Sequence, residues 1–224
     1  ASMLAERGYT VTGISPDAQQ IAIAKQCVKD NVSFECITFE AFSAPTESFD
    51  IILLQESAQY IQALSLFNKA YSLLNTNGLI LIADEVALQR TTKDSLGVLP
   101  MLTYTLAQAQ RCGFELKDKI DLSTQAAPTV DYLLWVIKQH SATLLTDLNL
   151  EAAVLDNLLT SLHEYQQKYR EGIYGYVLLS LVKSAPPRWQ ITAMTAQDKE
   201  SVSALFGEVF HPQQLTDTHW EWKY

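Results

Sequence analysis

The sequence predicts an α/β protein built on a mostly parallel sheet with helices on both faces. Two observations lead to this fold class. Apolar strands alternate with amphipathic helices through the first half of the chain, with short connections between them. The runs "FDIILL" and "LILIA" are apolar throughout, apart from one Asp in the first, which is typical of strands buried on both faces. Strand–helix–strand units of this kind form parallel sheets with right-handed crossovers.

Each predicted element in the first half has a local signal. Ile21, Ala24 and Val28 recur at helical spacing, whereas the segment after them alternates as a strand does. The segment "NTNG" closes a helix, and Gly78 is predicted to supply the turn geometry there. In chain order, the sequence predicts a strand at 9–14, a helix at 17–29, strands at 32–37 and 49–54, a helix at 64–74 and a strand at 79–83.

The pattern changes in the second half of the chain. After a predicted helix at 94–111, the segments 114–123 and 174–183 both alternate like edge strands and form a late antiparallel strand pair. Between them lies a helical insertion at about 125–172, too long to be a loop. An insertion between two late strands lies above the carboxyl edge of the sheet, where open α/β folds bind ligands. It is therefore a candidate lid.

A composition change near the C-terminus predicts a domain boundary. Residues 185–188 contain two prolines and are interpreted as a linker between a first domain at 1–184 and a second segment at 189–224. That segment restarts as a strand, a turn and an amphipathic helix. Its length is too small to bury a core of its own, so it is predicted to be the opening of a second domain.

Charge and composition exclude several classes of function. The formal net charge is −9 and no basic cluster is present, which argues against a nucleic-acid or anionic-membrane surface. The longest apolar run is strand-sized, far shorter than a membrane span. Cys27, Cys36 and Cys112 have no ligand spacing, so no metal site is expected and a reduced, cytoplasmic protein is predicted.

Candidate site residues follow the first three predicted strands, because the carboxyl ends of parallel strands meet at one edge of a sheet. Hydroxyl and amide groups can bind a ribose, a flat ring can stack on a heterocycle, and a carboxylate can accept from an exocyclic amine. The alternative interpretation is a set of polar turns and ordinary helix N-termini. The candidates are Ser15 and Gln20 after the first strand, Thr38, Phe39 and Glu40 after the second, and Gln55, Glu56 and Tyr60 after the third.

Four segments together resemble class I S-adenosylmethionine-dependent methyltransferases: "GYTVTGISPDAQQIAIAK", "FDIILLQESAQYI", "YSLLNTNGLILIADE" and "RCGFEL". The resemblance covers about residues 1–184 and implies a Rossmann-like fold with S-adenosyl-L-methionine as cofactor. "GISPDAQQ" and "TFEAF" are most similar to the cyclopropane-fatty-acid-synthase-like branch. That resemblance makes Ser15 and Gln20 ribose contacts and Phe39 and Glu40 adenine contacts, with Thr38 and Gln55 as further cofactor-side candidates.

The sequence also departs from that branch. Its catalytic Glu-His pair aligns with Gln59 and Tyr60, so cyclopropanation is not expected, whereas simple methyl transfer needs mainly proximity and alignment. Glu56 and Tyr60 are the candidate catalytic or orienting residues. The family's first strand and glycine-rich loop would precede Ala1. The chain is therefore expected to lack them and to bind the cofactor weakly or not at all.

Aromatic residues of the predicted lid allow two interpretations. They could line a pocket for a small, partly apolar substrate, or they could pack the lid onto the sheet. The residues concerned are Tyr132, Trp135, Tyr165, Tyr169 and Tyr174.

The segment 189–224 resembles the N-terminal strand and first helix of GNAT-type N-acetyltransferases. That resemblance implies acetyl-CoA as the cofactor of a second domain, without assigning any residue to it. The function predicted for the chain is methyl transfer to a small molecule, and the second segment allows a bifunctional methyltransferase and N-acetyltransferase. Two alternatives stay open at this point: a non-catalytic binding or scaffolding module, and a nicotinamide-dependent oxidoreductase.

Overall fold

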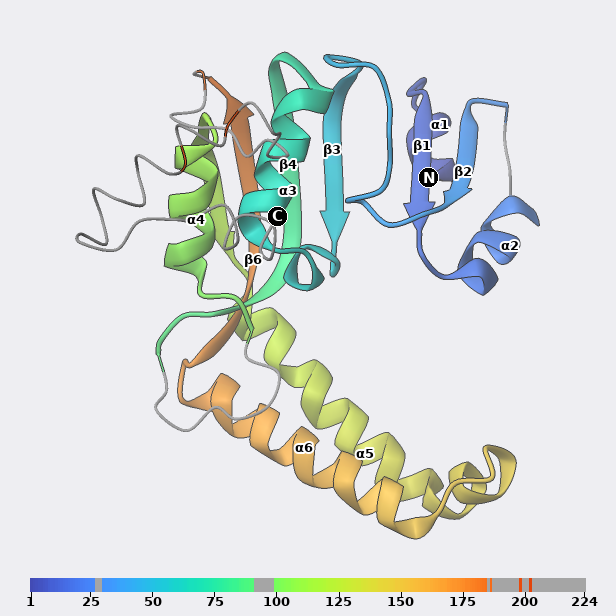
Figure 1. The fold of residues 1–224 in the computed structure, drawn as a ribbon. Coiled ribbons are helices and arrows are strands. Elements are labelled where there is room, and N and C mark those ends of the chain that lie inside the picture. The colour runs from blue at the N-terminus through green and yellow to red at the C-terminus, as the bar shows by residue number, and fades with distance from the viewer. Residues whose placement is uncertain (27–29, 91–98, 185, 187–197, 199–201, 203–224) are drawn as a thin grey trace, which may run out of the picture. The chain divides into compact units, whose positions relative to one another are not determined.

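The computed structural model describes residues 1–26, 30–90, 99–184, 186, 198 and 202. The chain divides into two compact units, Ala1–Trp189 and Gln190–Tyr224. The segment predicted to open a second domain, together with most of the predicted linker, lies outside the described residues. The elements below all belong to the first unit (Figure 1).

The first unit alternates strands and helices before a long helical hairpin. Its elements are α1 (Ser2–Ala5), β1 (Val11–Ser15), α2 (Ala18–Gln26), β2 (Val32–Cys36), β3 (Phe49–Gln55), the short 3₁₀ helix η1 (Ala58–Tyr60), α3 (Ala63–Leu73), β4 (Leu74–Ala87), α4 (Leu102–Arg111), β5 (Phe114–Asp121), α5 (Ser123–Asp147), α6 (Ala152–Arg170) and β6 (Tyr174–Lys183).

The strands form two sheets. β1 and β2 pair in parallel, and a second sheet has the order β3-β4-β6-β5. In that sheet β3 and β4 are parallel, whereas β6 is antiparallel to both β4 and β5. These observations confirm the predicted mixed α/β fold with a late antiparallel pair. β5 lies at an edge, as predicted, but β6 lies between β4 and β5, so its assignment as an edge strand was wrong. Alternation of apolar and polar residues shows that one face of a strand is buried, but it does not show how many strands pair with it.

Gly78 does not supply the turn geometry that the sequence predicted. The left-handed backbone conformation belongs to Asn77, with φ of 64°. β4 already begins at Leu74, directly after α3. A Cβ at Gly78 would lie 2.9 Å from the carbonyl oxygen of Asn75, so the glycine is needed for this close approach instead.

The helix predicted at 94–111 begins at Leu102. Residues 94–98 lie outside the described residues, but 99–101 are not helical. Pro100 accounts for the difference, because a proline disfavours helical backbone at the residue before it. Ala87 donates its backbone N–H to the carbonyl oxygen of Pro100 at 3.0 Å, and Met101 forms an isolated bridge with Ala87.

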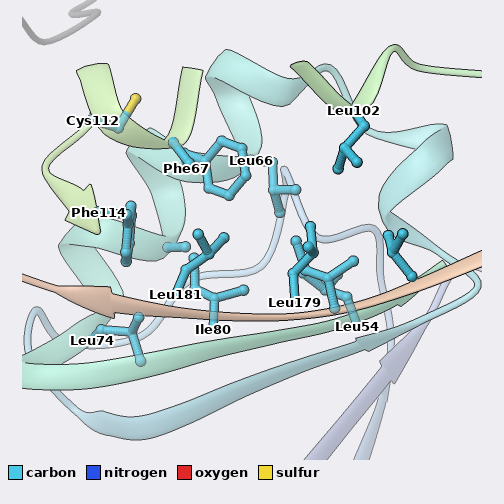
Figure 2. Close-up of a cluster of buried hydrophobic side chains, with 14 of the residues drawn as sticks. Leu54, Leu66, Phe67, Leu74, Ile80, Leu102, Cys112, Phe114, Leu179 and Leu181 are labelled. Atoms are coloured by element: carbon cyan, nitrogen blue, oxygen red, sulfur yellow. The ribbon is translucent and has the colours of Figure 1, made fainter. Parts of the chain in front are cut away.

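The main core lies between α3, α4 and one face of the four-stranded sheet. Figure 2 shows Leu66 and Phe67 of α3 directed toward side chains of β4 and β6. Phe67 is fully buried and its ring centroid lies 5.8 Å from that of Phe114 on β5. The side chains that alternate toward this face are Ile80, Ile82 and Val86 on β4 and Val177, Leu179 and Leu181 on β6.

The opposite face of the same sheet is covered at one end. There the α5–α6 hairpin packs on Tyr174 of β6. Farther along that face, Leu53 on β3 and Ile120 on β5 are 52% and 47% exposed. In the part of the chain that the structure describes, this apolar surface is therefore open to solvent.

The insertion predicted as a lid is the α5–α6 hairpin, whose two helices lie side by side beyond the carboxyl end of β3 (Figure 1). α5 is interrupted at His140, where φ and ψ are −112° and 16°. A second apolar cluster forms at the base of the hairpin, around Val130, Leu134, Tyr169 and Tyr174. The hairpin is thus anchored at its base.

Candidate functional site

A cavity of about 430 Å³ lies between β1 and β3. Thr12 and Ile14 line it from β1, whereas apolar positions of β3 line it from the other side, and residues 37–40 close the end that follows β2. β1 and β3 are each the terminal strand of their sheet. The cavity therefore separates two strand edges that have no strand partner within the described ranges.

The "TFEAF" segment forms a tight turn at this cavity. The hydroxyl of Thr38 accepts the backbone N–H of Ala41 at 3.2 Å, which shapes the turn. Phe42 is buried against Phe49, with ring centroids 6.0 Å apart, and so fixes the turn to β3. Thr38, Phe39 and Glu40 all line the cavity. The three candidates predicted after the second strand therefore lie together, with the Phe39 ring half-buried and the Glu40 side chain exposed.

Ser15 and Gln20 also lie together, at the carboxyl end of β1. The Ser15 hydroxyl donates to Gln20 Oε1 at 2.9 Å. The neighbours of Ser15 in sequence, Ile14 and Pro16, line the cavity. Asp17 caps α2 by accepting the N–H of Gln19 at 2.7 Å, as expected at an ordinary helix N-terminus. The pair predicted to contact a ribose is thus preformed beside the cavity.

Of the candidates predicted after the third strand, one lines the cavity and two do not. Tyr60 lines the cavity, although 80% of it is exposed. Gln55 and Glu56 are exposed at the end of β3, and neither lines the cavity. Glu56 has a left-handed φ of 49°, an uncommon conformation for a residue other than glycine. Its carboxylate accepts the hydroxyl of Tyr176 at 3.2 Å.

Asp84 is a buried charged residue that was not predicted from the sequence. It is 2% exposed, on the α3–α4 face of β4, and accepts the backbone N–H groups of Gln59 at 3.1 Å and Glu85 at 2.9 Å. Burial raises its pKa, and these backbone hydrogen bonds oppose that rise only in part. Asp84 therefore holds η1, the short helix that carries Tyr60, against the end of β4.

The raised pKa of Asp84 predicts a pH-dependent difference in stability. The folded state holds the Asp84 proton more tightly than the unfolded state does. The contribution of Asp84 to the free energy of unfolding therefore falls as the pH rises from the ordinary pKa of the unfolded state to the raised pKa of the folded state. We expect the stability of the wild type relative to Asp84→Asn to be highest at low pH, to fall through that window and to stay at the lower value above it. Urea denaturation of both proteins between about pH 3 and pH 8 measures this difference. A difference that is constant or that grows with pH would contradict the assignment.

The lid aromatics separate into two groups. Tyr132 and Trp135 are 62% and 56% exposed on α5 and stack on each other, with centroids 6.0 Å apart. Tyr165, Tyr169 and Tyr174 form a compact group where α6 meets the sheet. The second group packs the lid onto the sheet, whereas the first faces solvent, so the five residues do not line one pocket.

Two further residues near the site were not predicted from the sequence. Glu85 on β4 and Tyr176 on β6 are register partners, and both lie at the carboxyl end of the sheet. Burial, followed by the Glu56 carboxylate, raises the pKa of Tyr176 to about 12. A signal for Glu85 exists in the sequence: "LILIADE" ends an apolar strand with two acidic residues.

Two kinds of feature are absent from the described ranges. No group of three or more His, Cys, Asp or Glu side chains could hold a metal ion there. Within the same ranges, every helix is too short or too polar to cross a membrane.

The fold matches that of a Rossmann-like methyltransferase. Residues 1–82 match the family model described as a methyltransferase domain. No curated protein is detectably similar to the sequence.

Three solved structures resemble the chain, each over 78% of its length. A putative sarcosine dimethylglycine methyltransferase from Galdieria sulphuraria is 14% identical with a TM-score of 0.66, and the match covers 70% of it. A cyclopropane synthase from Mycobacterium tuberculosis is 16% identical with a TM-score of 0.67, and again 70% of it is covered. A phosphoethanolamine N-methyltransferase from Haemonchus contortus, solved with phosphomonomethylethanolamine and S-adenosylhomocysteine, is 18% identical with a TM-score of 0.64, with 43% covered.

Proposed function

We propose that this chain is the methyltransferase part of an S-adenosylmethionine-dependent enzyme that methylates a small molecule. The observation that carries the proposal is the end of the cavity that follows β2, where Phe39 and Glu40 line the wall. Ser15 and Gln20, already joined by a hydrogen bond, flank it. An aromatic ring, a carboxylate and a hydroxyl–amide pair are the groups that a nucleoside needs from a protein.

The residues at the cavity fit the nucleoside half of the cofactor. In this proposal the Phe39 ring stacks on adenine and the Glu40 carboxylate accepts from its exocyclic amine. Ser15 and Gln20 bind the ribose hydroxyls, with Thr38 and Gln55 as further contacts. S-adenosylmethionine, when bound, supplies a methyl group on a sulfonium centre.

Glu56 and Tyr60 are the proposed acceptor-side residues. Glu56 can take a proton from an acceptor, because its carboxylate is exposed and is held by a hydrogen bond from the Tyr176 hydroxyl. The left-handed backbone at Glu56 is costly for a residue other than glycine, which supports a functional constraint at this position. Tyr60 can orient the acceptor from the cavity rim.

The proposed cofactor domain is completed by one more strand. β1 and β3 run in the same direction (Figure 1), and each presents toward the same apolar cavity an edge that no described strand pairs with. Buried backbone N–H and C=O groups require partners, and a strand lying parallel to both edges supplies them. We assign this strand, with its glycine-rich loop, to polypeptide preceding Ala1.

The remaining part of the proposal concerns residues 189–224. Their resemblance to the start of a GNAT-type domain supports a bifunctional methyltransferase and N-acetyltransferase, in which acetyl-CoA serves the second domain. The small-molecule acceptor is supported by the structural relatives, one of which was solved with phosphomonomethylethanolamine.

Calorimetric titration with S-adenosylhomocysteine tests the cofactor. We expect weak or no binding by the chain of residues 1–224, and micromolar binding by a version extended at its N-terminus to include the proposed strand. Micromolar binding by the shorter chain would show that the added strand is dispensable. If the extended protein binds nicotinamide dinucleotide instead, an oxidoreductase is favoured, and if it binds neither, a non-catalytic module is favoured.

In the extended protein, Phe39→Ala should weaken S-adenosylhomocysteine binding by about 1–3 kcal/mol, because stacking on one base contributes that much. This corresponds to roughly a 5- to 150-fold higher Kd. Tyr132→Ala is the matched control, since that aromatic residue is 62% exposed on α5. Equal affinity of the Phe39 and Tyr132 variants would remove Phe39 from the site.

A further inference from the structure

One carboxylate of the sheet binds both phenols of the lid helix. Tyr165 donates its hydroxyl to Glu85 Oε2 at 2.6 Å, and Tyr169 donates to Glu85 Oε1 at 2.6 Å. The two tyrosines are four residues apart on α6 and therefore face the same side of the helix. Because α6 and β4 are far apart in sequence, this double contact fixes one helix of the hairpin to one point of the sheet.

The same contact lies in a closely packed aromatic group. The Tyr165 ring packs edge-on against Tyr174 of β6, with centroids 5.0 Å apart, and lies 5.9 Å from Tyr169. Tyr169 and Tyr174 are buried. The Lys168 ammonium donates to the Tyr174 hydroxyl at 3.0 Å and lies 4.7 Å from the centre of that ring. Apolar packing therefore supports the hairpin base independently of Glu85, whereas Glu85 fixes its position.

Glu85 is also adjacent to the proposed acceptor side. Its register partner on β6 is Tyr176, whose hydroxyl donates to Glu56. The carboxylate that holds the lid and the carboxylate proposed to act on the acceptor are therefore linked through neighbouring strands at the same end of the sheet.

We infer that Glu85 is a positioning residue, which sets the α5–α6 hairpin over the carboxyl edge of the sheet by binding Tyr165 and Tyr169. Its importance for methyl transfer rests on the function proposed above, whereas the anchoring itself does not. Hydrogen bonds to a carboxylate are about twice as strong as those between neutral groups, and their loss leaves two half-buried or buried hydroxyls without their acceptor. Without the carboxylate the hairpin stays folded but is less fixed.

Hydrogen–deuterium exchange of the wild-type chain and Glu85→Gln measures the anchoring. We expect backbone amides at the C-terminal end of α6, residues 165–170, to exchange about tenfold or more faster in Glu85→Gln, while α3 is unchanged. Glu164→Gln is the matched control, because it removes the same charge from an exposed residue next to Tyr165. Equal exchange in the Glu85 and Glu164 variants would overturn the inference.

A double-mutant cycle distinguishes anchoring from general packing. Tyr165→Phe with Tyr169→Phe keeps both rings but removes both donors. Adding Glu85→Gln to this background should accelerate exchange by less than about twofold, since the interaction is already lost. A full tenfold effect in that background would mean that Glu85 acts through other contacts. If Glu85→Gln does not fold, the double variant Tyr165→Phe/Tyr169→Phe is compared with the wild type instead, and the same acceleration of exchange is expected.

Phenol absorbance provides a spectroscopic signature that packing alone would not change. Burial and the Glu85 carboxylate raise the pKa of both Tyr165 and Tyr169. In Glu85→Gln we expect both phenols to ionise at lower pH, and in Glu164→Gln we expect no shift. The other groups that face them are constant in this comparison: Glu56, Lys168, Tyr174 and Tyr176. No shift in Glu85→Gln would overturn the inference. Neither readout uses cofactor, so a protein that failed to bind S-adenosylhomocysteine would leave this result standing.

Discussion

Phe67→Ala is expected to lower the free energy of unfolding by about 3–5 kcal/mol, the range for removing a fully buried aromatic ring. Phe67 is 0% exposed and lies at the centre of the core beneath α3. Its neighbours Ile80 and Leu181 belong to central strands, which cannot move together to fill the space without disturbing their ladders. The cost therefore includes a cavity as well as the lost transfer free energy.

Urea denaturation of the wild type and the variant measures this cost. Tyr104→Ala is the control, since that aromatic residue lies on the neighbouring helix α4 but is 50% exposed. We expect the control to lose less than about 1 kcal/mol. Equal losses at the two positions would mean that the α3 face is not the main core.

The helices and strands of the first unit were predictable because their sequence signals are local. The apolar run "FDIILL" became β3, and the repeat at Ile21 and Ala24 became α2. The errors arose at positions whose conformation is set by an adjacent residue or by strand pairing. Asn77, not Gly78, took the left-handed position, and Pro100 delayed the start of α4. Alternation could not show that β6 is central, because alternation is the same for edge and central strands with one buried face.

The candidate site was predictable only in part. Positions at strand ends follow from topology, so the order of strands and helices along the chain was enough to place Thr38, Phe39 and Glu40 at one edge of the sheet. Their roles toward a cofactor stay predictions. The acidic pair at the end of "LILIADE" was visible, but no role could be given to Asp84 and Glu85, because their partners are far away in sequence: the N–H of Gln59, and the phenols of α6.

Adding the proposed strand between β1 and β3 should change the free-energy cost of the substitution Leu53→Ala. Leu53 lines the cavity and is 52% exposed, so Leu53→Ala in the chain of residues 1–224 should cost less than about 1 kcal/mol. In a version extended by the proposed strand, side chains of that strand on the same face of the sheet lie beside Leu53 and cover part of it, so the cost should rise by about 0.2–1 kcal/mol. Leu66→Ala is the control, because Leu66 on α3 is 1% exposed, does not line the cavity and should cost the same in both versions.

Comparing the two versions distinguishes a strand paired between β1 and β3 from an extension that only raises the overall stability. An extension that stabilised the protein elsewhere would raise the unfolding free energy of every variant equally and leave the cost of Leu53→Ala small. Hydrogen exchange adds a second criterion, since amides on the facing edges of β1 and β3 should become protected only if a strand pairs with them. A raised Leu53 cost together with new protection on both edges requires a paired strand between β1 and β3. An unchanged Leu53 cost with unprotected edges would remove that strand, and with it the proposal that a cofactor domain is completed at this gap.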